Sequence, residues 1–559
     1  MMPTTRPVAV DERTRTFLRP VRIVHTVGQV RNAPVLLTDT PLQIHVTEPE
    51  TVTLDNRGTA ERAGILLDFG RELQGGVRLL CAATPGATYP AVRLRFGESA
   101  SEAMTPLGVK NAGNDHAVRD FVVPVPAMSD QEWGQTGFRF VYIELQEPEA
   151  ELLLSGVLAV SVLRDMPQKG TFRCSDPRIN DIFDTSVYTC LLCMQHHLWD
   201  GVKRDRLIWI GDSHPEMLTI RTAFGYQEVL EDSLDDVVAT TPLPRWMNDM
   251  PAYSLWWLCI LRDWYHYTGN AAYPAKHREY IRGLSRHIAG LVDETGFLKL
   301  DGYFLDWPSA GSKAAEDGDH ALAILALGSA RELLRLWPEE DDGCLALVDE
   351  ALTRLRRHPM DGCGYKPTVA MLYLAGMASA EDTARQLIAD GDKGFSTFMS
   401  FYLLTALAQT AGTPAALAAL RSYYGGMLDM GATTFWEDFH TEWMEGSSPI
   451  DRLPREGERD IHGDFGGYCY KNFRHSLCHG WASGPVPFLM ETVLGIRFET
   501  PGGKRIRLTP SLGDLDWAEG TYPLPDGSVL SVRCERTETG VRTTYTAPSD
   551  IIVSVDDTY

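Results

Sequence analysis

Residues 175–193 read SDPRINDIFDTSVYTCLLC, and this stretch decides the interpretation of the fold. Ser175 or Asp176 is a good helix N-cap, and Pro177 suits the first helical position. Apolar residues then recur at helical spacing, at Ile179, Ile182, Phe183, Val187, Leu191 and Met194. The stretch therefore predicts an amphipathic helix at the point where a β-rich sequence gives way to a helical one.

The sequence before this helix is typical of short β-strands. Candidate strands cover residues 35–37, 43–46, 64–69, 76–80, 92–96 and 138–145. Several alternate apolar with polar residues, and Gly, Pro, Asn or Asp occupy the gaps between them. Gly75-Gly76 predicts a hairpin or a bulge. We expect an N-terminal β-sandwich domain over residues 1–170.

The sequence after residue 171 is mainly helical up to residue 495. Helical patterns cover residues 255–267, 280–292, 321–336, 344–356, 395–411 and 414–428. Paired helices joined by loops rich in Gly, Pro and Trp favour an α/α toroid, and no fixed-period motif indicates a solenoid instead. Strand patterns return at residues 504–508, 528–533, 542–545 and 551–555. They predict a small C-terminal β domain over residues 496–559, and the fold class is therefore multidomain α+β.

Length and charge restrict the class of protein. A chain of 559 residues exceeds what one hydrophobic core usually serves, so several domains are expected. The net charge of -23 argues against nucleic acid and acidic membrane surfaces as partners. The N-terminus lacks the apolar region of a secretory signal, and no apolar run reaches the ~18 residues that span a bilayer. A neutral substrate is the most compatible with this net negative charge.

The ten cysteines are scattered along the chain. In a large protein without a signal peptide they are expected to be reduced thiols, which predicts a cytoplasmic location. Cys190 and Cys193 form a lone C-x-x-C pair, and a metal or redox role there is a minor alternative because no second pair completes a site.

Residues 199–212, WDGVKRDRLIWIGD, contain three carboxylates, three cations and two tryptophans. Acids and arginines can hydrogen-bond hydroxyl groups, and tryptophan covers the C–H face of a sugar ring. The stretch therefore suits a pocket for a neutral polyhydroxylated molecule. The alternative is a solvated salt-bridge loop that its tryptophans anchor to the core.

A second cluster of acids and aromatic residues lies at residues 431–437, GATTFWE. Cleavage of a glycosidic bond needs a proton donor and a base or nucleophile, which two carboxyl groups can supply. Asp205 and Glu437 are the candidates, and loops that converge at one end of a toroid could bring them together. The alternatives are an ion pair of Asp205 with Arg204 or Arg206, and a solvated loop position for Glu437.

Further candidates combine aromatic rings with acids or histidines: Trp246 with Asp249, Trp256-Trp257, Asp306-Trp307, Glu442-Trp443 and His479-Gly480-Trp481. Tryptophans within helices are more often core residues than ligand platforms, whereas loop positions favour function. His475 and His479 could share a helix face, with His462 and Asp464 near in sequence. Because no H-E-x-x-H motif or cysteine pair completes a ligand set, we expect no metal and no cofactor.

Two motifs together resemble the signature of the α-L-rhamnosidases of glycoside hydrolase family 78. They are Asp200-x-x-x-Arg204-Asp205-Arg206-x-x-Trp209-x-Gly211-Asp212 and the Gly-Ala-Thr-Thr-Phe-Trp-Glu run at residues 431–437. Residues 67–72, 95–98 and 501–506 also look like this family. The resemblance implies an N-terminal β-sandwich, a central (α/α)6 barrel and a small C-terminal β-sandwich domain. It also implies hydrolysis of terminal α-L-rhamnosyl bonds with inversion.

The resemblance implies that Asp205 is the general acid and Glu437 the general base that activates water. Predicted substrate contacts come from Asp200, Arg204, Trp209, Asp212, Trp256, Asp306, Trp307, Trp436 and His479. The family commonly has Arg-Asp-Glu with the glutamate as acid, whereas here Arg206 follows Asp205. Asp212 or Glu216 is therefore an alternative acid, and Glu442 or Asp464 could contribute.

The expected partner is a small rhamnoside or a rhamnose-containing oligosaccharide. The sequence does not define the oligomeric state, and a homodimer is one of the alternatives. Two other functions remain as alternatives. One is the same fold and inverting chemistry on another sugar, and the other is a non-catalytic rhamnose-binding protein, which the missing glutamate suggests.

Overall fold

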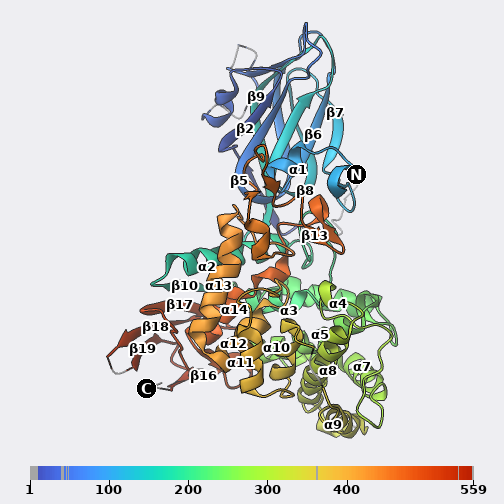
Figure 1. Ribbon diagram of the computed structural model, residues 1–559, viewed down its shortest axis with the longest axis vertical. Helices are drawn as coiled ribbons and strands as arrows, with labels where there is room; N and C mark the ends of the chain where they lie inside the picture. Colours follow the sequence, from blue (N-terminus) through green and yellow to red (C-terminus); the bar gives the residue numbers. More distant parts are fainter. Residues whose placement is uncertain are drawn as a thin grey trace, which may run out of the picture. The chain divides into compact units, whose positions relative to one another are not determined.

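The computed structural model describes residues 11–39, 43–45, 47, 50–340, 342–360, 363–538 and 540–556 (Figure 1). The chain divides into two compact units. The first, called the sheet unit, comprises Met1–Met166, Leu191–Arg206 and Gly446–Cys478. The second, called the helical unit, comprises Pro167–Cys190, Leu207–Glu445 and His479–Tyr559. The segments 191–206 and 446–478 therefore group with the N-terminal strands, and the three-domain division stays a prediction.

The sheet unit is built on a nine-stranded sheet whose paired strands are all antiparallel (Figure 1). The strands are β1 (Arg13–Leu18), β2 (Arg22–Val27), β3 (Gln29–Arg31), β4 (Val52–Asp55), β5 (Gly64–Ala83), β6 (Ala91–Gly97), β7 (Asp120–Pro124), β8 (Ser129–Leu145) and β9 (Glu151–Arg164). Their order is β3-β4-β9-β5-β8-β6-β7, while β1 also pairs with β9 and β2 with β5. The long central strands β5, β8 and β9 carry the main core.

Successive residues of a strand point to opposite faces, and both faces of β5 are buried. Ile65 and Leu67 belong to the large apolar cluster. Leu66 joins a smaller cluster with Ala100 and Ala103 of the short helix α1 (Ala100–Met104). Helix α1 is thereby fixed against the sheet, directly after β6.

The predicted strands 64–69 and 76–80 are parts of the single strand β5, so a hairpin at Gly75-Gly76 is wrong and the bulge is confirmed. The pairing of β5 with β8 shifts register between Gly75 and Val77. A Cβ on Gly75 would lie 1.9 Å from the carbonyl oxygen of Val160 on β9, so the close approach of β9 requires glycine.

Two other predicted strands differ from the structure. Residues 35–37 lie in a 3-10 helix, η1 (Ala33–Leu37), because a proline occupies its first turn and buried Val35 and Leu36 face the core. Residues 43–45 form no strand, and Val46 lies outside the described residues. The predicted strands 92–96 and 138–145 are confirmed within β6 and β8.

The helical unit contains most of α2 and all of α3 to α14. The helices are α2 (Pro177–Cys193), α3 (Ser213–Ala223), α4 (Glu228–Thr240), α5 (Pro251–Thr268), α6 (Ala272–Lys276), α7 (Arg278–Gly290), α8 (Lys313–Leu334), α9 (Cys344–Leu355), α10 (Lys366–Leu374), α11 (Ala380–Ile388), α12 (Ser400–Ala411), α13 (Thr413–Asp429) and α14 (Pro485–Phe488). The predicted helix after Pro177 is confirmed. The predicted segment 395–411 becomes helical only from Ser400. Among the described residues, no helix has the length and apolar character needed to cross a bilayer.

Several of these helices pack against one another in a closed ring. Helix α3 packs against α5, α5 against α8, α8 against α10, α10 against α12, α12 against α14, and α14 against α3. Other helices pack against members of this ring, such as α9 on α8, α11 on α12 and α13 on α12. Loops at the ends of the ring helices are therefore held by a continuous packed framework.

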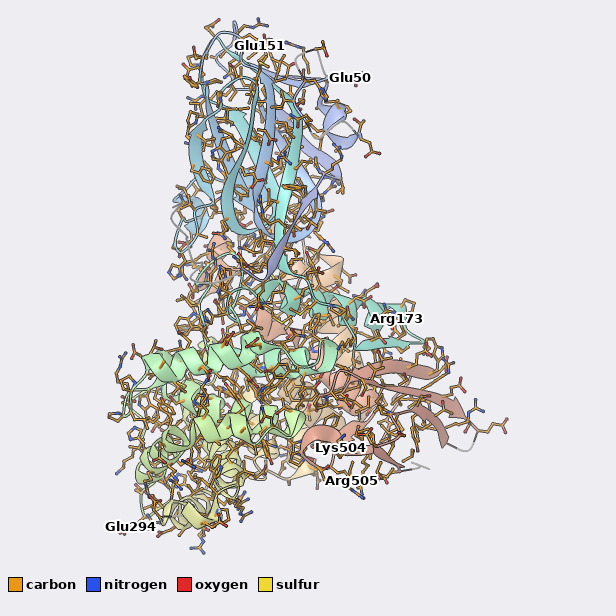
Figure 2. The ribbon with its side chains drawn as sticks, turned by 180° about the vertical axis from the view of Figure 1, so that it is seen from behind. Glu50, Glu151, Arg173, Glu294, Lys504 and Arg505 are labelled. Atoms are coloured by element: carbon orange, nitrogen blue, oxygen red, sulfur yellow. The ribbon has the colours of Figure 1, made fainter. Side chains whose placement is uncertain are left out.

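Strands of the helical unit form two sheets. An antiparallel sheet has the order β10 (Thr171–Cys174), β17 (Trp517–Pro523), β18 (Val529–Thr537), β19 (Gly540–Thr546). A second sheet has the order β15 (Ile496–Phe498), β16 (Arg505–Leu508), β20 (Ile552–Val555), and Arg505 at the start of β16 is labelled in Figure 2. The predicted C-terminal strands are confirmed, and β10 joins them from the segment that precedes α2.

Candidate active site

Glu437 lies at the end of the GATTFWE segment, in the loop that follows α13. Its side chain is buried, and its backbone oxygen accepts hydrogen bonds from Thr397 Oγ1 at 2.6 Å and from Trp481 Nε1 at 3.0 Å. Gly431, with a φ of 88°, turns the chain after the helix. These two hydrogen bonds fix the backbone from which the Glu437 side chain extends.

Glu437, Asp212 and His479 come together in the helical unit, from three distant parts of the sequence. His479 Nε2 lies 4.0 Å from Glu437 Oε1 and 3.9 Å from Asp212 Oδ2. The hydroxyl of Tyr253 on α5 donates to Asp212 Oδ1 at 2.6 Å. All of these side chains are buried. Two carboxyl groups beside one imidazole offer several acceptors and a donor to the hydroxyl groups of a ligand.

Trp209 is held beside this group by its neighbours. Asn248 accepts a hydrogen bond from the Ile210 amide at 3.0 Å and donates to the Ile208 carbonyl at 2.9 Å. The Trp209 ring lies edge-on to Tyr253, with 6.0 Å between ring centres. Its buried indole N–H has no hydrogen-bond partner among the described residues.

Asp306 and Trp307 lie at the start of a 3-10 helix, η4 (Trp307–Ser309). Asp306 forms a capping box with Ser309 and also accepts a hydrogen bond from the Tyr365 hydroxyl. Burial raises the pKa of Asp306. Trp307 is half-buried and packs edge-on against Phe304 at 5.2 Å. The Asp306 carboxyl therefore already stabilises this turn.

Asp438 follows Glu437 directly and is also buried. Burial raises the pKa of Asp438 to about 7, and the charges of Glu437 and Asp306 act in the same direction. The helical unit thus concentrates acidic groups around Glu437.

Trp256 and Trp436 are each 1% exposed. Trp256 on α5 stacks on His214 with 5.0 Å between the ring centres, and its ring centre lies 5.1 Å from that of Tyr402. Trp436 lies edge-on to Phe439 at 5.5 Å. Both rings belong to aromatic packing, and their contact with substrate stays a prediction.

Asp200, Arg204 and Asp205 belong to the sheet unit. Asp200 is buried, whereas the Asp205 side chain is 15% exposed. Asp205 Oδ1 lies 3.1 Å from Arg204 Nη1 and 2.9 Å from His116 Nδ1. The ion pair with Arg204, which the sequence left open, is therefore present. It does not exclude a role in catalysis, because the carboxyl group remains partly accessible.

The backbone at Asp205 and Arg206 is unusual. Their φ angles are 53° and 57°, and two successive residues with a side chain rarely adopt this left-handed conformation. Such strain costs of the order of 1–3 kcal/mol per residue and tends to occur at functional sites. Arg206 is held by donation to the Gln135 carbonyl at 2.6 Å, and its guanidinium lies 4.9 Å from the centre of the Trp199 ring.

The alternative acids lie in different surroundings. Glu216 on α3 is fully buried against Gly480, where a Cβ would lie 1.4 Å from Glu216 Oε1. Glu442 is exposed and pairs with Lys393 at 2.9 Å. Asp464 pairs with Lys110. The last two acids therefore form ordinary surface ion pairs.

One group of residues has the spacing of metal ligands. Atoms of Glu98, Glu102 and His462 lie within 4.8 Å of one another, and all three residues are buried. The ammonium of Lys203, however, lies 3.2 Å from Glu98 Oε2 and 3.0 Å from Glu102 Oε1. A cation of the chain itself thus occupies the position between these carboxylates. Cys190 and Cys193 are buried and are not joined in a disulfide.

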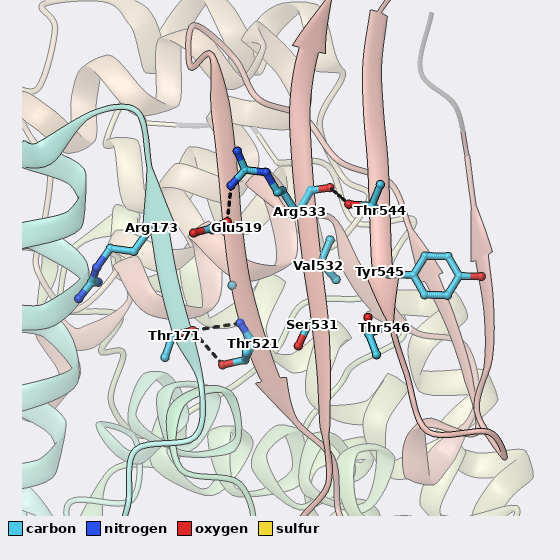
Figure 3. A pocket seen from close by; sticks show the side chains of 11 residues that line it. Thr171, Arg173, Glu519, Thr521, Ser531, Val532, Arg533, Thr544, Tyr545 and Thr546 are labelled. Atoms are coloured by element: carbon cyan, nitrogen blue, oxygen red, sulfur yellow. Dashed lines mark hydrogen bonds and ion pairs between the residues drawn. The ribbon is translucent and has the colours of Figure 1, made fainter.

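A hollow of about 340 Å³ lies on the sheet that β10 shares with β17 to β19 (Figure 3). Across its four strands Figure 3 shows Thr171, Thr521, Ser531 and Thr546, beside the ion pair of Arg533 with Glu519. None of the predicted site residues lines this hollow. Polar side chains are expected on the solvent face of an antiparallel sheet, so the hollow gives no separate indication of catalysis.

Sequence reasoning did not identify Tyr253, Asn248 and Thr397. Tyr253 belongs to an ordinary apolar helix pattern, and Asn248 and Thr397 are polar residues without a motif. They act by hydrogen-bonding site residues that lie far away in the sequence, and one sequence gives no signal for such pairs.

Residues 167–313 match a family model described as the bacterial alpha-L-rhamnosidase 6 hairpin glycosidase domain. The chain is also similar to three solved structures. The first is a GH78 family rhamnosidase of Bacillus sp. GL1, with 22% identity over 91% of this chain and 55% of that chain and a TM-score of 0.71. The second is a rhamnosidase from Klebsiella oxytoca with rhamnose bound, with 18% identity over 86% of this chain and 96% of that chain and a TM-score of 0.63. The third is a Streptomyces avermitilis alpha-L-rhamnosidase complexed with L-rhamnose, with 16% identity over 90% of this chain and 49% of that chain and a TM-score of 0.67. No curated protein matches the sequence.

These comparisons confirm the resemblance to the α-L-rhamnosidases that the two motifs indicated. At 16 to 22% identity, the likeness to the three structures establishes a shared fold. The chain spans 55% of the length of the Bacillus enzyme, about half of it.

Proposed function

We propose that this chain, which has the fold of the α-L-rhamnosidases, is an inverting exo-glycoside hydrolase that removes terminal α-L-rhamnose from small rhamnosides. The observation that carries the proposal is the grouping of Glu437, Asp212 and His479 in the helical unit. Glu437 closes one of the two motifs and Asp212 closes the other. Burying several ionisable groups together is costly, and such clusters tend to occur at functional sites.

In the proposed reaction Asp205 gives its proton to the glycosidic oxygen as the bond to the anomeric carbon breaks. Glu437 takes a proton from a water molecule whose oxygen bonds to the same carbon from the opposite face. The sugar therefore leaves with inverted configuration. This mechanism requires the two carboxyl groups to be about 6.5–9.5 Å apart, so that the water fits between the base and the sugar.

The proposed substrate contacts follow from the chemistry of rhamnose, a 6-deoxy sugar. Its hydroxyl groups need partners such as Asp200, Arg204, Asp212 and His479. Its methyl group and C–H face need an apolar wall. Trp209, with its buried indole N–H, supports such a wall and adds a donor. Trp256, Asp306, Trp307 and Trp436 complete the proposed set.

We also propose the arrangement of the domains and the location of the protein. The closed ring of contacts among α3, α5, α8, α10, α12 and α14 supports an (α/α)6 barrel. Apolar clusters on both faces of β5 support an N-terminal β-sandwich. The ten free cysteines, eight of them buried, support a cytoplasmic location.

Glu437→Gln tests the proposal. This change keeps the shape and removes the base, so the rate on p-nitrophenyl α-L-rhamnoside should fall about 10²–10⁴-fold, the usual contribution of acid–base catalysis. Rhamnose binding, measured by calorimetry, should persist. Glu279→Gln, a matched change at an exposed position of α7, should retain wild-type activity. Near-normal turnover by Glu437→Gln would reject the assignment.

The same assays separate the alternative functions. A panel of aryl glycosides would identify an enzyme for another sugar by its hydrolysis of a different glycoside. A non-catalytic rhamnose-binding protein would be stabilised thermally by rhamnose and would cleave none of the panel.

A further inference from the structure

Lys203 is a buried cation of the sheet unit, only 8% exposed. Its ammonium lies 3.0 Å from Glu102 Oε1 and 3.2 Å from Glu98 Oε2, and it donates to the His475 carbonyl at 2.6 Å. Lysine is rarely buried unless its charge is compensated. Here two carboxylate oxygens and one backbone carbonyl oxygen surround the ammonium.

Glu98 links this cation to a second segment of the sheet unit. It follows β6 directly, and its Oε2 accepts a hydrogen bond from the Leu477 amide at 2.6 Å. Its Oε1 accepts from Ser476 Oγ at 3.2 Å. Lys203 and Glu98 together therefore hold residues 475–477 against the loop that contains Asp205.

The charge of Lys203 matters because few other cations reach these acids. Arg119 Nε is 3.9 Å from Glu102 Oε1, beyond hydrogen-bond distance. His462 hydrogen-bonds Ser99 and the His475 carbonyl, and burial lowers its pKa well below the usual value, so it stays neutral. Burial also raises the pKa of Glu98 to about 7, and Lys203 opposes this shift. Without Lys203 the two neighbouring carboxylates would repel each other.

The loop on both sides of Lys203 is anchored at Val202, Arg204 and Arg206. The Val202 carbonyl accepts from the Gly137 amide at 2.8 Å. Arg204 Nε donates to the Arg474 carbonyl at 2.9 Å, and Arg206 donates to the Gln135 carbonyl. These contacts enclose Asp205, whose left-handed backbone must be imposed by its surroundings.

We propose that Lys203 is a positioning residue, whose buried ammonium between Glu98 and Glu102 fixes the strained loop that presents Asp205 as general acid. This inference rests on the proposed function. Lys203 does not touch substrate, and its effect is transmitted through the backbone of the next two residues.

The test compares two substrates that differ in their need for an acid. A 2,4-dinitrophenyl rhamnoside has a good leaving group that needs little protonation, whereas a methyl rhamnoside depends on it. Lys203→Met should lower kcat/KM on the methyl glycoside at least about tenfold more than on the dinitrophenyl glycoside. Asp205→Asn should show the same selectivity, and Lys203→Arg, which keeps the charge, should recover most of the activity.

Lys366→Met is the matched control. Lys366 is also a buried lysine, 6% exposed, and donates to the Gly391 carbonyl at 2.6 Å in the helical unit. Lys366→Met should leave the ratio of the two kcat/KM values as in wild type, because any effect of lost stability is common to both substrates. Assays run below the melting temperature of each variant keep the comparison to folded protein.

If Lys203→Met lowers kcat/KM by the same factor on both substrates, the inference is overturned. If Lys203→Met does not fold, Glu98→Gln replaces it, because this change removes one of the two carboxylates around the ammonium. It should give the same selectivity to a smaller extent, and an equal loss on both substrates overturns the inference. A wild-type protein that cleaves neither rhamnoside rejects the proposed function and the inference with it. An active wild type with selective Asp205→Asn but unselective Lys203→Met rejects the inference alone.

Discussion

At the scale of single residues, Tyr253 shows how a helix position controls a site. Its hydroxyl donates to Asp212 Oδ1 at 2.6 Å, and its ring contacts Trp209 edge-on. A hydrogen bond to a charged group typically contributes about 1.5–3 kcal/mol. The orientation of the Asp212 carboxyl, and hence its proposed contact with a sugar hydroxyl, therefore depends on this phenol.

Tyr253→Phe should weaken rhamnose binding by roughly tenfold, because one bond of this strength orients Asp212. Titration calorimetry with rhamnose measures the change. Tyr545→Phe, at a position that is 46% exposed on β19, is the control and should bind like wild type. Unchanged affinity in Tyr253→Phe would remove Asp212 from the binding site.

Asp438 predicts a pH dependence of stability. Burial raises the pKa of Asp438 to about 7 in the folded protein, from its ordinary value of 3.8. The folded state therefore holds its proton more tightly than the unfolded state. The resulting stabilisation is complete below pH 3.8 and is lost as pH rises to about 7.

Asp438→Asn should remove this contribution, so its unfolding free energy should decline less than that of wild type between pH 5 and pH 8. Urea unfolding at the two pH values measures both slopes. Identical slopes for variant and wild type would show that Asp438 ionises normally in the folded protein.

At the scale of elements, the residues of the candidate site lie mostly in short segments between helices. Hydrogen bonds from other segments fix the backbone of these segments. The loop with Trp209 is bracketed by Asn248, which bonds the peptide groups on both sides of it. Asn248 itself has a φ of 55°, in the left-handed region that asparagine and glycine tolerate.

Asn248→Gly keeps this backbone conformation and removes both hydrogen bonds. We expect a stability loss of about 1–3 kcal/mol and weaker rhamnose binding, because the Trp209 loop is released. Thermal unfolding and calorimetry measure the two effects. A variant that loses stability but binds rhamnose normally would show that this loop does not contact the sugar.

Sequence patterns predicted elements well where local chemistry is decisive. The cap at Ser175 to Pro177 and the apolar spacing beyond it predicted α2, and alternation predicted β6 and β8. They failed at residues 35–37, where three apolar residues fit a buried 3-10 turn as well as a strand. They also divided β5 at Gly75-Gly76, because only the approach of β9 determines that these glycines form a bulge.

At the scale of the whole molecule, the order of β, α and β patterns predicted the class of fold, but the compact units are not continuous in sequence. Residues 191–206 and 446–478 group with the N-terminal strands, and β10 pairs with β17 across most of the helical sequence. Periodicity reports local structure only, so such long-range pairings give no signal. The grouping of Asp212, Glu437 and His479 was predicted from motifs, whereas their supporting hydrogen bonds were not.

In the proposed reaction, water that Glu437 activates attacks the α-L-rhamnoside directly. Proton NMR during the hydrolysis of an aryl α-L-rhamnoside measures the configuration of the first sugar released. Inversion predicts that β-L-rhamnose appears first and then equilibrates with the α form. First release of α-L-rhamnose would contradict the mechanism, and release of no rhamnose would contradict the function.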